Sequence, residues 1–452
     1  MKKLIFLLIS FFFSLITSEF SYSQTWSPLG SGTNNIVTNM IMYNNELIAG
    51  GSFTMAGGEN IKAIAKWNGT SWSPLGSGLS GTATFVIGLT VYNGELIAGG
   101  MFTTAGGVSA SNIAKWNGTS WSPLGSGTNN VVVTLCVYNN ELIAGGDFTS
   151  AGGTPANHIA KWNGTSWSAF PGGMDVRVCN LTVFNNELIA GGQFLAAGTV
   201  PANFIAKWNG TTWSPLGSGM NSFVYALKVY NNNLIAGGWF SMAGGDSASY
   251  IAKWNGSSWS PLGSGITGSG DRQVNTLTVY NNELIVGGIF SSAGGVSAGN
   301  IAKWNGSAWS SIGGGTNGNG VLGLEANSNS LFVGGQFTMA GTTLASNIAR
   351  WGLPTGIKAI NENMPYKYTL SQNYPNPFNP STLIKFAVPC ASSVKISVFD
   401  VSGRALETLV NEYIQPGTYQ IQWNAANYSS GVYFYKIQTG DFTETKRMIL
   451  LK

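Results

Sequence analysis

Few residues in this chain could do acid–base, nucleophilic or metal chemistry, and they are not grouped as a catalytic site requires. Among 452 residues there is 1 histidine, His158, and there are 3 cysteines, Cys136, Cys179 and Cys390. One imidazole cannot build a multi-histidine copper centre, and the cysteines lack the paired spacing of a zinc site. Their odd number also argues against a disulfide framework. We therefore expect no cofactor, no metal and no enzyme activity.

Glutamate and lysine each recur at one position per repeat of the sequence. The glutamates follow Asn-Asn or Asn-Gly pairs, and the lysines stand in I-A-K-W segments. Acid and base carboxylates work as a pair roughly 5–10 Å apart in a cleft, which single repeated surface positions do not supply. We expect the glutamates on a turn face, and the lysines on solvated outer strands with their stems packed on tryptophan. The positions are Glu46, Glu95, Glu141, Glu187 and Glu283, with Lys66, Lys115, Lys161, Lys207, Lys253, Lys303 and Arg350.

Three short sequence units, counted with their close variants, recur seven times each between residues 25 and 351, and they predict the fold. The first is E-L-I-A-G-G-x-F around Gly50, the second is I-A-K-W ending at Trp67, and the third is W-S-P-L-G starting at Trp26 and Trp72. Copies stand 46 to 50 residues apart, and a period of this size with about four strands indicates the blades of a propeller. We predict an all-β chain in which residues 24–352 form a seven-bladed β-propeller of four-stranded blades.

Each repeat divides into four strands at its turn residues. In the first copy, residues 36–43 and 46–53 flank Asn44-Asn45, and residues 64–67 precede Asn68-Gly69 and a fourth strand at Trp72. Asparagine and Asn-Gly favour tight hairpins, and Gly-Gly lets a neighbouring sheet or ring approach the backbone closely. The first W-S-P-L-G has no preceding strands, whereas the last repeat stops after three. We therefore expect residues 25–29 to pair with the strand around residues 348–351, leaving no free edge.

Gly-Gly in the second strand, followed by two aromatic residues, resembles the kelch repeat over residues 25–351. The two aromatic residues here are both tryptophan and five positions apart, whereas kelch repeats usually carry a tyrosine and a tryptophan at slightly wider spacing. The resemblance implies the propeller fold and does not imply a function.

Residues 1–23 have the order of a signal peptide, with Met1-Lys2-Lys3, an apolar run over residues 4–16, and small or polar residues up to Gln24. We expect cleavage before Gln24. An apolar run of about 13 residues is too short to span a bilayer, which needs ~20. We therefore expect a mature chain without a transmembrane anchor, secreted or held at the outer-membrane surface.

The segment after the repeats combines a linker over residues 353–367 with a small antiparallel sandwich over residues 368–452. Its motifs include Asn373-Tyr374-Pro375-Asn376-Pro377-Phe378, Pro416-Gly417-Thr418-Tyr419 and Ser430-Gly431-Val432-Tyr433, with a final strand from Lys446. The segment resembles the type A sorting domain of the bacterial type IX secretion system. The resemblance implies an Ig-like β-sandwich and export by the type IX machinery as a partner. It assigns the sorting motif to Asn373, Pro375, Asn376, Pro377, Gly431, Tyr433 and Lys446. An Ig-like module that binds carbohydrate or protein is the alternative.

The net charge and one short motif bear on two further questions, nucleic-acid binding and glycosylation. The net charge of +4 is small for this length and is not collected into a basic run, so nucleic acid is not expected as a partner. Asp246-Ser247-Ala248 matches a short O-glycosylation pattern of bacteria that use type IX export, with Ser247 as the acceptor.

Loop lengths indicate where a ligand would bind. Length varies only between W-S-P-L-G and the next first strand, and in an up-and-down blade those loops share one face, where propellers commonly bind. The candidate contacts on this loop face are Phe85, Asp175, Arg177, Phe223, Tyr225, Asp271 and Arg272. We predict a cell-surface or secreted binding or adhesion protein whose loop face binds a glycan or a protein. The alternative is an exported carbohydrate-active hydrolase or lyase that uses loop carboxylates.

Overall fold

The computed structural model describes residues 24–268, 270–328, 330–352, 357–361, 365–390, 392–414 and 416–452. These residues are all-β, without a helix among them. They fall into two compact units, one over Thr25–Gly352 and one that includes Leu353–Lys452. The signal peptide predicted over residues 1–23 lies outside the described residues. Within the described ranges, no helix has the length and apolar character needed to cross a membrane.

The described part of Thr25–Gly352 contains seven four-stranded antiparallel sheets, each with the strand order first, second, third, fourth. The first strands are β2 (Val37–Tyr43), β9 (Phe85–Tyr92), β15 (Val132–Tyr138), β21 (Val178–Phe184), β27 (Val224–Tyr230), β34 (Gln273–Tyr280) and β40 (Val321–Ala326). The second strands are β3 (Glu46–Gly51), β10 (Glu95–Met101), β16 (Glu141–Gly146), β22 (Glu187–Gly192), β28 (Asn233–Gly238), β35 (Glu283–Ile289) and β41 (Ser330–Gly335).

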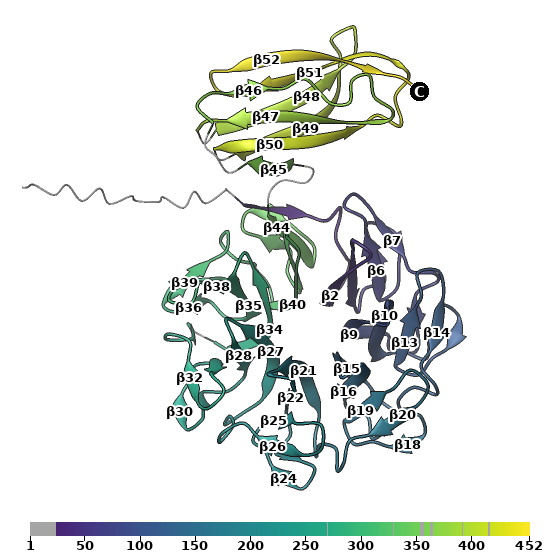
Figure 1. The fold of residues 1–452 in the computed structure, drawn as a ribbon, viewed down its shortest axis with the longest axis vertical. Helices are drawn as coiled ribbons and strands as arrows, with labels where there is room; N and C mark the ends of the chain where they lie inside the picture. The colour runs from purple at the N-terminus through teal and green to yellow at the C-terminus, as the bar shows by residue number, and fades with distance from the viewer. Residues whose placement is uncertain are drawn as a thin grey trace, which may run out of the picture. The chain divides into compact units, whose positions relative to one another are not determined.

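The outer half of each sheet is shorter. The third strands are β6 (Ile64–Trp67), β13 (Ile113–Trp116), β19 (Ile159–Trp162), β25 (Ile205–Trp208), β31 (Ile251–Trp254), β38 (Ile301–Trp304) and β44 (Ile348–Gly352). The fourth strands are β7 (Trp72–Pro74), β14 (Trp121–Pro123), β20 (Trp167–Ala169), β26 (Trp213–Pro215), β32 (Trp259–Pro261), β39 (Trp309–Ser311) and β1 (Thr25–Pro28). Figure 1 shows the first strands gathered around the centre of this unit and the fourth strands outside them.

Neighbouring sheets meet through their first strands. Each first strand lies beside that of the next sheet, and β40 lies beside β2. β1, from the start of the unit, pairs with β44, so that Trp26 faces Trp351 and Ser27 faces Arg350. The arrangement is therefore propeller-like, with sheets set side by side about a common centre.

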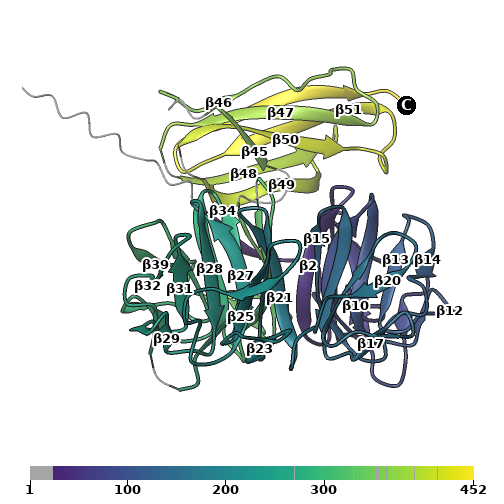
Figure 2. The same ribbon diagram turned by 60° about the horizontal axis from the view of Figure 1, so that its bottom comes forward.

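Short hairpins occupy the loops between the second and third strands. They are β4 (Met55–Ala56) with β5 (Glu59–Asn60), β11 (Thr104–Ala105) with β12 (Val108–Ser109), β17 (Ser150–Ala151) with β18 (Thr154–Pro155), β23 (Ala196–Ala197) with β24 (Val200–Pro201), β29 (Met242–Ala243) with β30 (Asp246–Ser247), β36 (Ser292–Ala293) with β37 (Val296–Ser297), and β42 (Met339–Ala340) with β43 (Thr343–Leu344). β8 (Leu79–Ser80) and β33 (Ile266–Thr267), from loops after fourth strands, extend two of them. Figure 2 shows β12, β17, β23 and β29 on the same side of the unit, which is the loop face.

The Gly-Gly pair allows two different close approaches. A Cβ on Gly50 would lie 2.6 Å from Cγ1 of Val86 in the next sheet, and one on Gly334 would lie 2.6 Å from Cγ1 of Val37. The second glycine faces its own sheet, where a β-bulge shifts the register of the first strand. A Cβ on Gly51 would overlap the carbonyl oxygen of Ile36. The group that approaches the first glycine is thus a valine side chain of the next sheet, and the group that approaches the second is a carbonyl oxygen at the bulge. Neither is an indole ring.

Tryptophan links consecutive sheets by a repeated hydrogen bond. The indole Nε1–H of Trp72 donates to the carbonyl oxygen of Leu29 at 2.8 Å, and Trp121 donates to Leu75 in the same way. The two tryptophans of one sheet also touch, as Trp67 and Trp72 do with ring centroids 5.3 Å apart. For Trp213, the residue that corresponds to the accepting leucine in the repeat before it is Phe170, whose ring packs on the indole. The buried Nε1 of Trp213 has no hydrogen-bond partner within the described residues.

This difference gives a prediction about stability. Trp72→Phe should lower the free energy of unfolding by about 1 kcal/mol more than Trp213→Phe, because only the first substitution removes an indole hydrogen bond. Both remove the same ring volume, so Trp213→Phe is the matched control. Urea denaturation followed by tryptophan fluorescence measures the difference, and equal losses would contradict it.

The repeated glutamates and lysines pair with each other, which the sequence analysis did not predict. In five of the seven sheets of the described residues, lysine Nζ lies 2.7–2.9 Å from glutamate Oε2 within the same sheet, as in Lys66–Glu46. Asn233 replaces the glutamate in the fifth repeat. In the seventh, Arg350 donates to the hydroxyl groups of Ser27 and Ser330. These carboxylates are therefore neutralised locally by a partner on the adjacent strand.

The second unit consists of two four-stranded antiparallel sheets around one core. One contains β45 (Ile357–Asn361), β50 (Gly417–Asn424), β47 (Ser381–Val388) and β46 (Thr369–Leu370), and the other contains β49 (Ala405–Ile414), β48 (Ser392–Phe399), β51 (Gly431–Gln438) and β52 (Thr443–Leu450). Trp423, Tyr419 and Tyr435 are fully buried between the sheets. The linker expected over residues 353–367 is in part a strand, because β45 pairs with β50.

Candidate functional site

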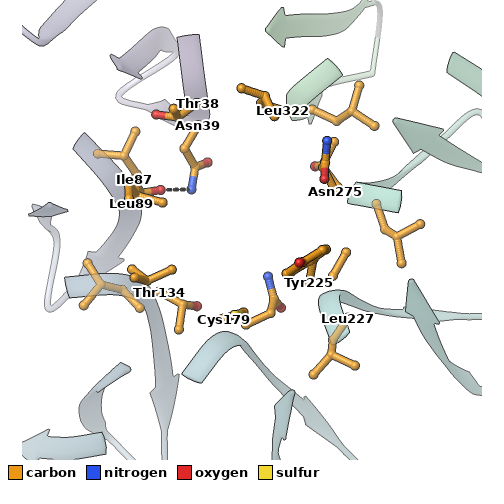
Figure 3. Close-up of a pocket in the computed structure, with 18 of the residues that line it drawn as sticks. Thr38, Asn39, Ile87, Leu89, Thr134, Cys179, Tyr225, Leu227, Asn275 and Leu322 are labelled. Atoms are coloured by element: carbon orange, nitrogen blue, oxygen red, sulfur yellow. Dashed lines mark hydrogen bonds between the residues drawn. The ribbon is translucent and has the colours of Figure 1, made fainter. Parts of the chain in front are cut away.

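A cavity of ≈ 520 Å³ lies between the seven first strands of the Thr25–Gly352 unit. Figure 3 shows side chains from these strands, among them Tyr225, Asn275 and Cys179, lining its open centre. One level of the cavity carries a large apolar side chain from every first strand: Met40, Leu89, Leu135, Leu181, Leu227, Leu277 and Leu324. The preceding two positions are more polar, and they bring the amides of Asn39, Asn180 and Asn275 and the hydroxyls of Thr38, Thr134 and Tyr225 into the lining.

Some of these polar groups serve the fold. Nδ2 of Asn39 donates to the carbonyl oxygen of Ile87 at 2.6 Å, and Nδ2 of Asn275 donates to that of Val321 at 3.2 Å. Each bond joins neighbouring sheets, as the dashed line in Figure 3 shows for Asn39. The cavity wall therefore has two levels. One is polar and includes inter-sheet hydrogen bonds, and the other is the ring of large apolar side chains.

Arg177 and Tyr225 are two predicted contacts that the structure brings to this cavity. Nε of Arg177 donates to Oδ1 of Asp147 at 2.6 Å, and its Nη2 contacts Oδ2 of the same carboxylate. This bidentate hydrogen bond raises the pKa of Arg177 above its usual range. Burial raises the pKa of Tyr225, so its hydroxyl stays neutral at physiological pH. The guanidinium is therefore held in place by Asp147, a residue that the sequence analysis did not single out.

Phe223 is the centre of an aromatic cluster on the loop face. Its ring centroid lies 5.8 Å from that of Phe204, 6.1 Å from that of Tyr225 and 6.1 Å from that of Trp239. Trp239 is 49% exposed, whereas the other three rings are half-buried. We call Phe204, Phe223, Tyr225 and Trp239 the aromatic cluster. Because Tyr225 also lines the cavity, the cluster and the cavity are contiguous through this residue.

The backbone beneath two aromatic residues is in the left-handed region. Phe204 and Tyr250 both have φ of 66°. At the same position, Asn112, Asn300 and Asn347 also have positive φ, but each of these amides donates a hydrogen bond to a loop carbonyl of the next repeat. Asparagine tolerates this conformation, while a bulky side chain is strained there by roughly 1–2 kcal/mol. Two repeats thus replace a favourable residue by an unfavourable aromatic one.

The remaining predicted contacts have different surroundings. Arg272 lies over the ring of Tyr250, 5.3 Å from its centroid, and Asp271 beside it is exposed. Phe85 is the first residue of β9 and is half-buried. Among the described residues, its ring makes no contact with a ring of the aromatic cluster. Oδ1 of Asp175 accepts hydrogen bonds from the backbone N–H groups of Leu195 and Ala196.

Asp175 is a structural residue of the repeat. Asn34, Asn129, Asn221 and Asn317 accept the same pair of backbone bonds in other repeats. An aspartate in place of asparagine keeps the accepting oxygen, so its departure from the repeat has a structural explanation. The structure therefore does not group Asp175 with the cavity, and its interpretation as a ligand contact has no support in this geometry.

The sequence analysis missed Phe204, Trp239, Tyr250 and Asp147. A signal existed, since aligning the repeats by Gly-Gly places Trp239 and Asp147 at the position held by Ser52, Met101, Gln193, Ile289 and Gln336. The same alignment places Phe204 and Tyr250 at the position of the asparagines. The part of the loop face around the aromatic cluster can therefore be found in the sequence, because its residues differ from those at the equivalent positions of the other repeats.

The cysteines have no disulfide partner within the described residues. Burial raises the pKa of the Cys179 thiol, in the cavity wall, to about 12, and that of Cys136 to about 11. A thiol with so high a pKa is protonated at neutral pH and is a poor nucleophile. Cys390, in the other unit, is exposed. In the cavity wall Cys179 is therefore a small neutral side chain.

In the second unit, the predicted sorting motif holds the last strand in place. Asn373 is 2% exposed, and its Nδ2 donates to the hydroxyl of Thr382 and to the carbonyl oxygen of Pro375. Oδ1 of Asn376 accepts the backbone N–H of Ile449 in β52. Pro375 and Pro377 are exposed between these anchors.

The other three motif residues lie on β51 and β52. Gly431 is opposite Leu450 and exposed. The Tyr433 hydroxyl donates to the carbonyl oxygen of Ser429, and its ring packs on Trp423. Lys446 is opposite Tyr435 and forms an ion pair with Glu444 at 2.8 Å. The motif therefore serves first to fasten the C-terminal strand to the sandwich.

Comparison with known proteins supports this assignment of the second unit. Residues 372–451 match the model of a secretion system C-terminal sorting domain. This match indicates export directed by type IX secretion. A search of curated proteins found no match. Among solved structures, the chain is similar to PorZ, described as an essential bacterial surface component of the type IX secretion system of Porphyromonas gingivalis, at 13% identity and a TM-score of 0.46. The similarity covers 93% of this chain and 60% of that one.

Proposed function

We propose that this chain is a secreted or cell-surface binding protein. In this proposal, Thr25–Gly352 is a closed, kelch-like seven-bladed β-propeller that displays a ligand-binding loop face. A signal peptide over residues 1–23 is removed, and the sorting domain delivers the chain through the type IX machinery. The match of residues 372–451 supports the export route.

The observation that carries the binding role is the aromatic cluster. Exposed or half-buried aromatic rings are common anchors of binding surfaces, and Trp239 exposes 49% of its surface in a repeat position that elsewhere holds a smaller side chain. Phe204 adds backbone strain to the same place. The repeat imposes this positive φ, which Ala63 and His158 share, so what distinguishes this position is its aromatic side chain.

The surroundings of the carboxylates support binding over hydrolysis. Asp147 is engaged by Arg177, and Asp175 accepts two backbone N–H groups. The glutamates of five repeats are paired with lysine. A glycosidase needs one carboxyl group held protonated and a second one ionised across a substrate. We therefore propose that the loop face has no catalytic role.

The test is a comparison of two variants at one repeat position. Trp239→Ser introduces the residue found at Ser52, and Met101→Ser makes the same change in a part of the loop face without the cluster. Full-length protein is screened against immobilised glycans and isolated extracellular proteins. We expect Trp239→Ser to lose at least tenfold in affinity for the ligand found, and Met101→Ser to retain it. A ligand that both variants bind as tightly as wild type would place the binding surface elsewhere.

A further inference from the structure

The chemistry of the aromatic cluster narrows the class of ligand, on the basis of the proposed function. Two charges near it neutralise each other, because Nε and Nη2 of Arg177 both contact the carboxylate of Asp147. Arg272 lies over Tyr250, and the adjacent Asp271 carries the opposite charge. Charges of both signs at short range create no field of one sign. This surface therefore lacks the electrostatic complementarity that a polyanion or a strongly basic partner requires.

Cavity size argues for a small ring-shaped group as the part of the ligand that enters. The cavity of ≈ 520 Å³ lies in the range of roughly 300–1,000 Å³ typical of small-molecule sites. Its lining offers neutral donors and acceptors, including the Asn180 amide on β21, the strand beside that of Tyr225, and the Thr134 hydroxyl on β15. A folded protein surface would cover the cavity without filling it. A polar ring with several hydroxyl groups would use both its volume and its hydrogen-bonding groups.

The aromatic cluster supplies the complementary apolar contacts. A pyranose ring has hydroxyl groups at its edge and C–H groups on its faces, and the partial positive charge of those C–H groups suits the negative face of an aromatic ring. Phe223 and Trp239 are in contact with each other, and Phe223 in turn contacts Tyr225 at the cavity. The rings thus form a continuous track from the cavity to exposed Trp239.

We propose that this track and the cavity form one binding site for an uncharged saccharide chain. The terminal sugar occupies the cavity beside Tyr225, where amides and hydroxyls bind its edge. The sugars that follow lie against Phe223 and Trp239. This arrangement uses Tyr225, Phe223 and Trp239 of the aromatic cluster. The charged residues of the cavity lining are Arg177, which is paired with Asp147, and Glu325, whose pKa is raised by burial.

The experiment uses the full-length chain and isothermal titration calorimetry. The probes are neutral hexasaccharides of glucose, mannose and galactose, with uronic-acid hexasaccharides as the charged comparison. We expect a neutral probe to bind with an affinity that changes less than twofold between 50 and 500 mM salt. Trp239→Ser and Tyr225→Thr, which introduce residues found at Ser52 and Thr38, should each weaken it at least tenfold. Met101→Ser should not, and thermal melts of all variants establish that they are folded.

The outcomes separate this inference from the proposed function. Binding of only the uronic-acid probes, or of no saccharide in the panel, overturns the saccharide assignment. If an extracellular protein is bound by wild type and lost in Trp239→Ser while no saccharide binds, the loop face is functional but its ligand is not a saccharide. If neutral saccharide binds equally to all folded variants, both the track and the proposed binding surface are wrong.

Discussion

Replacing Gly146 with alanine is expected to lower the free energy of unfolding of the Thr25–Gly352 unit by about 3 kcal/mol. A Cβ at this position would overlap the carbonyl oxygen of Val131, a backbone atom that cannot rotate away. Relief requires moving the bulge between β15 and β16, and with it Val132, which packs against Gly99 of the preceding sheet. Urea denaturation of wild type and variant measures the loss.

Gly153 supplies the control for this prediction. It also belongs to a Gly-Gly pair, but it has φ of 80° and open space where its Cβ would be. Asparagine accepts such a conformation, so Gly153→Asn should change stability by less than about 1 kcal/mol. If Gly146→Ala were no more damaging than Gly153→Asn, the packing explanation of the Gly-Gly unit would fail.

Deleting residues 353–452 should abolish export while the remaining unit still folds. The sandwich has a core of its own, formed by residues between Leu370 and Leu450, and the hydrophobic clusters of the Thr25–Gly352 unit consist of residues of that unit. The cut is placed after Gly352 because β45 belongs to the sandwich. The measurement is the fraction of protein outside the cell in a host with a type IX system, together with a thermal melt of the truncated chain.

A point variant controls for general damage to the sandwich. Val401 is 74% exposed and lies outside the sorting motif, so Val401→Ser should leave export unchanged. Export of the truncated chain at wild-type levels would refute the role of the sorting domain. Loss of its folding would instead contradict the independence of the two cores.

The repeated units predicted the strands because each repeated residue satisfies one local requirement. Asn44 and Asn45 have φ of 49° and 62°, as a tight hairpin requires. Asn68 accepts the backbone N–H groups of Thr70 and Ser71, which explains why the residue recurs. Patterns of this kind depend on neighbours in sequence and can be interpreted without the fold.

Pairings across strands could not be predicted in the same way. Lys66 reaches Glu46 because β6 lies beside β3 in a register that puts Lys66 opposite Ile48, which is two residues from Glu46 and on the same face of the sheet. From residue types alone, both side chains were predicted to lie on the surface, and their pairing could not be foreseen. The strand β45 within the expected linker was not predicted for a similar reason, since it is recognisable only through its partner β50.

The candidate site was predicted in part. Phe223 and Tyr225 were named from the loop in which they lie, and they do contact each other. Trp239 and Phe204 were not, because they stand directly beside strands, outside the variable loops from which the contacts were chosen. Asp175 was also named from its departure from the repeat, and it still performs the repeat's hydrogen bonding.

The pairing of β1 with β44 also governs when this protein can fold. Ser27 and Arg350 meet although 323 residues separate them. The sheet that holds them cannot be completed before the end of the unit has been synthesised, and contacts so distant in the chain slow folding. The sorting domain follows in the sequence, so a chain whose synthesis has not reached β44 presents a sheet that lacks both its third strand and the partner of β1.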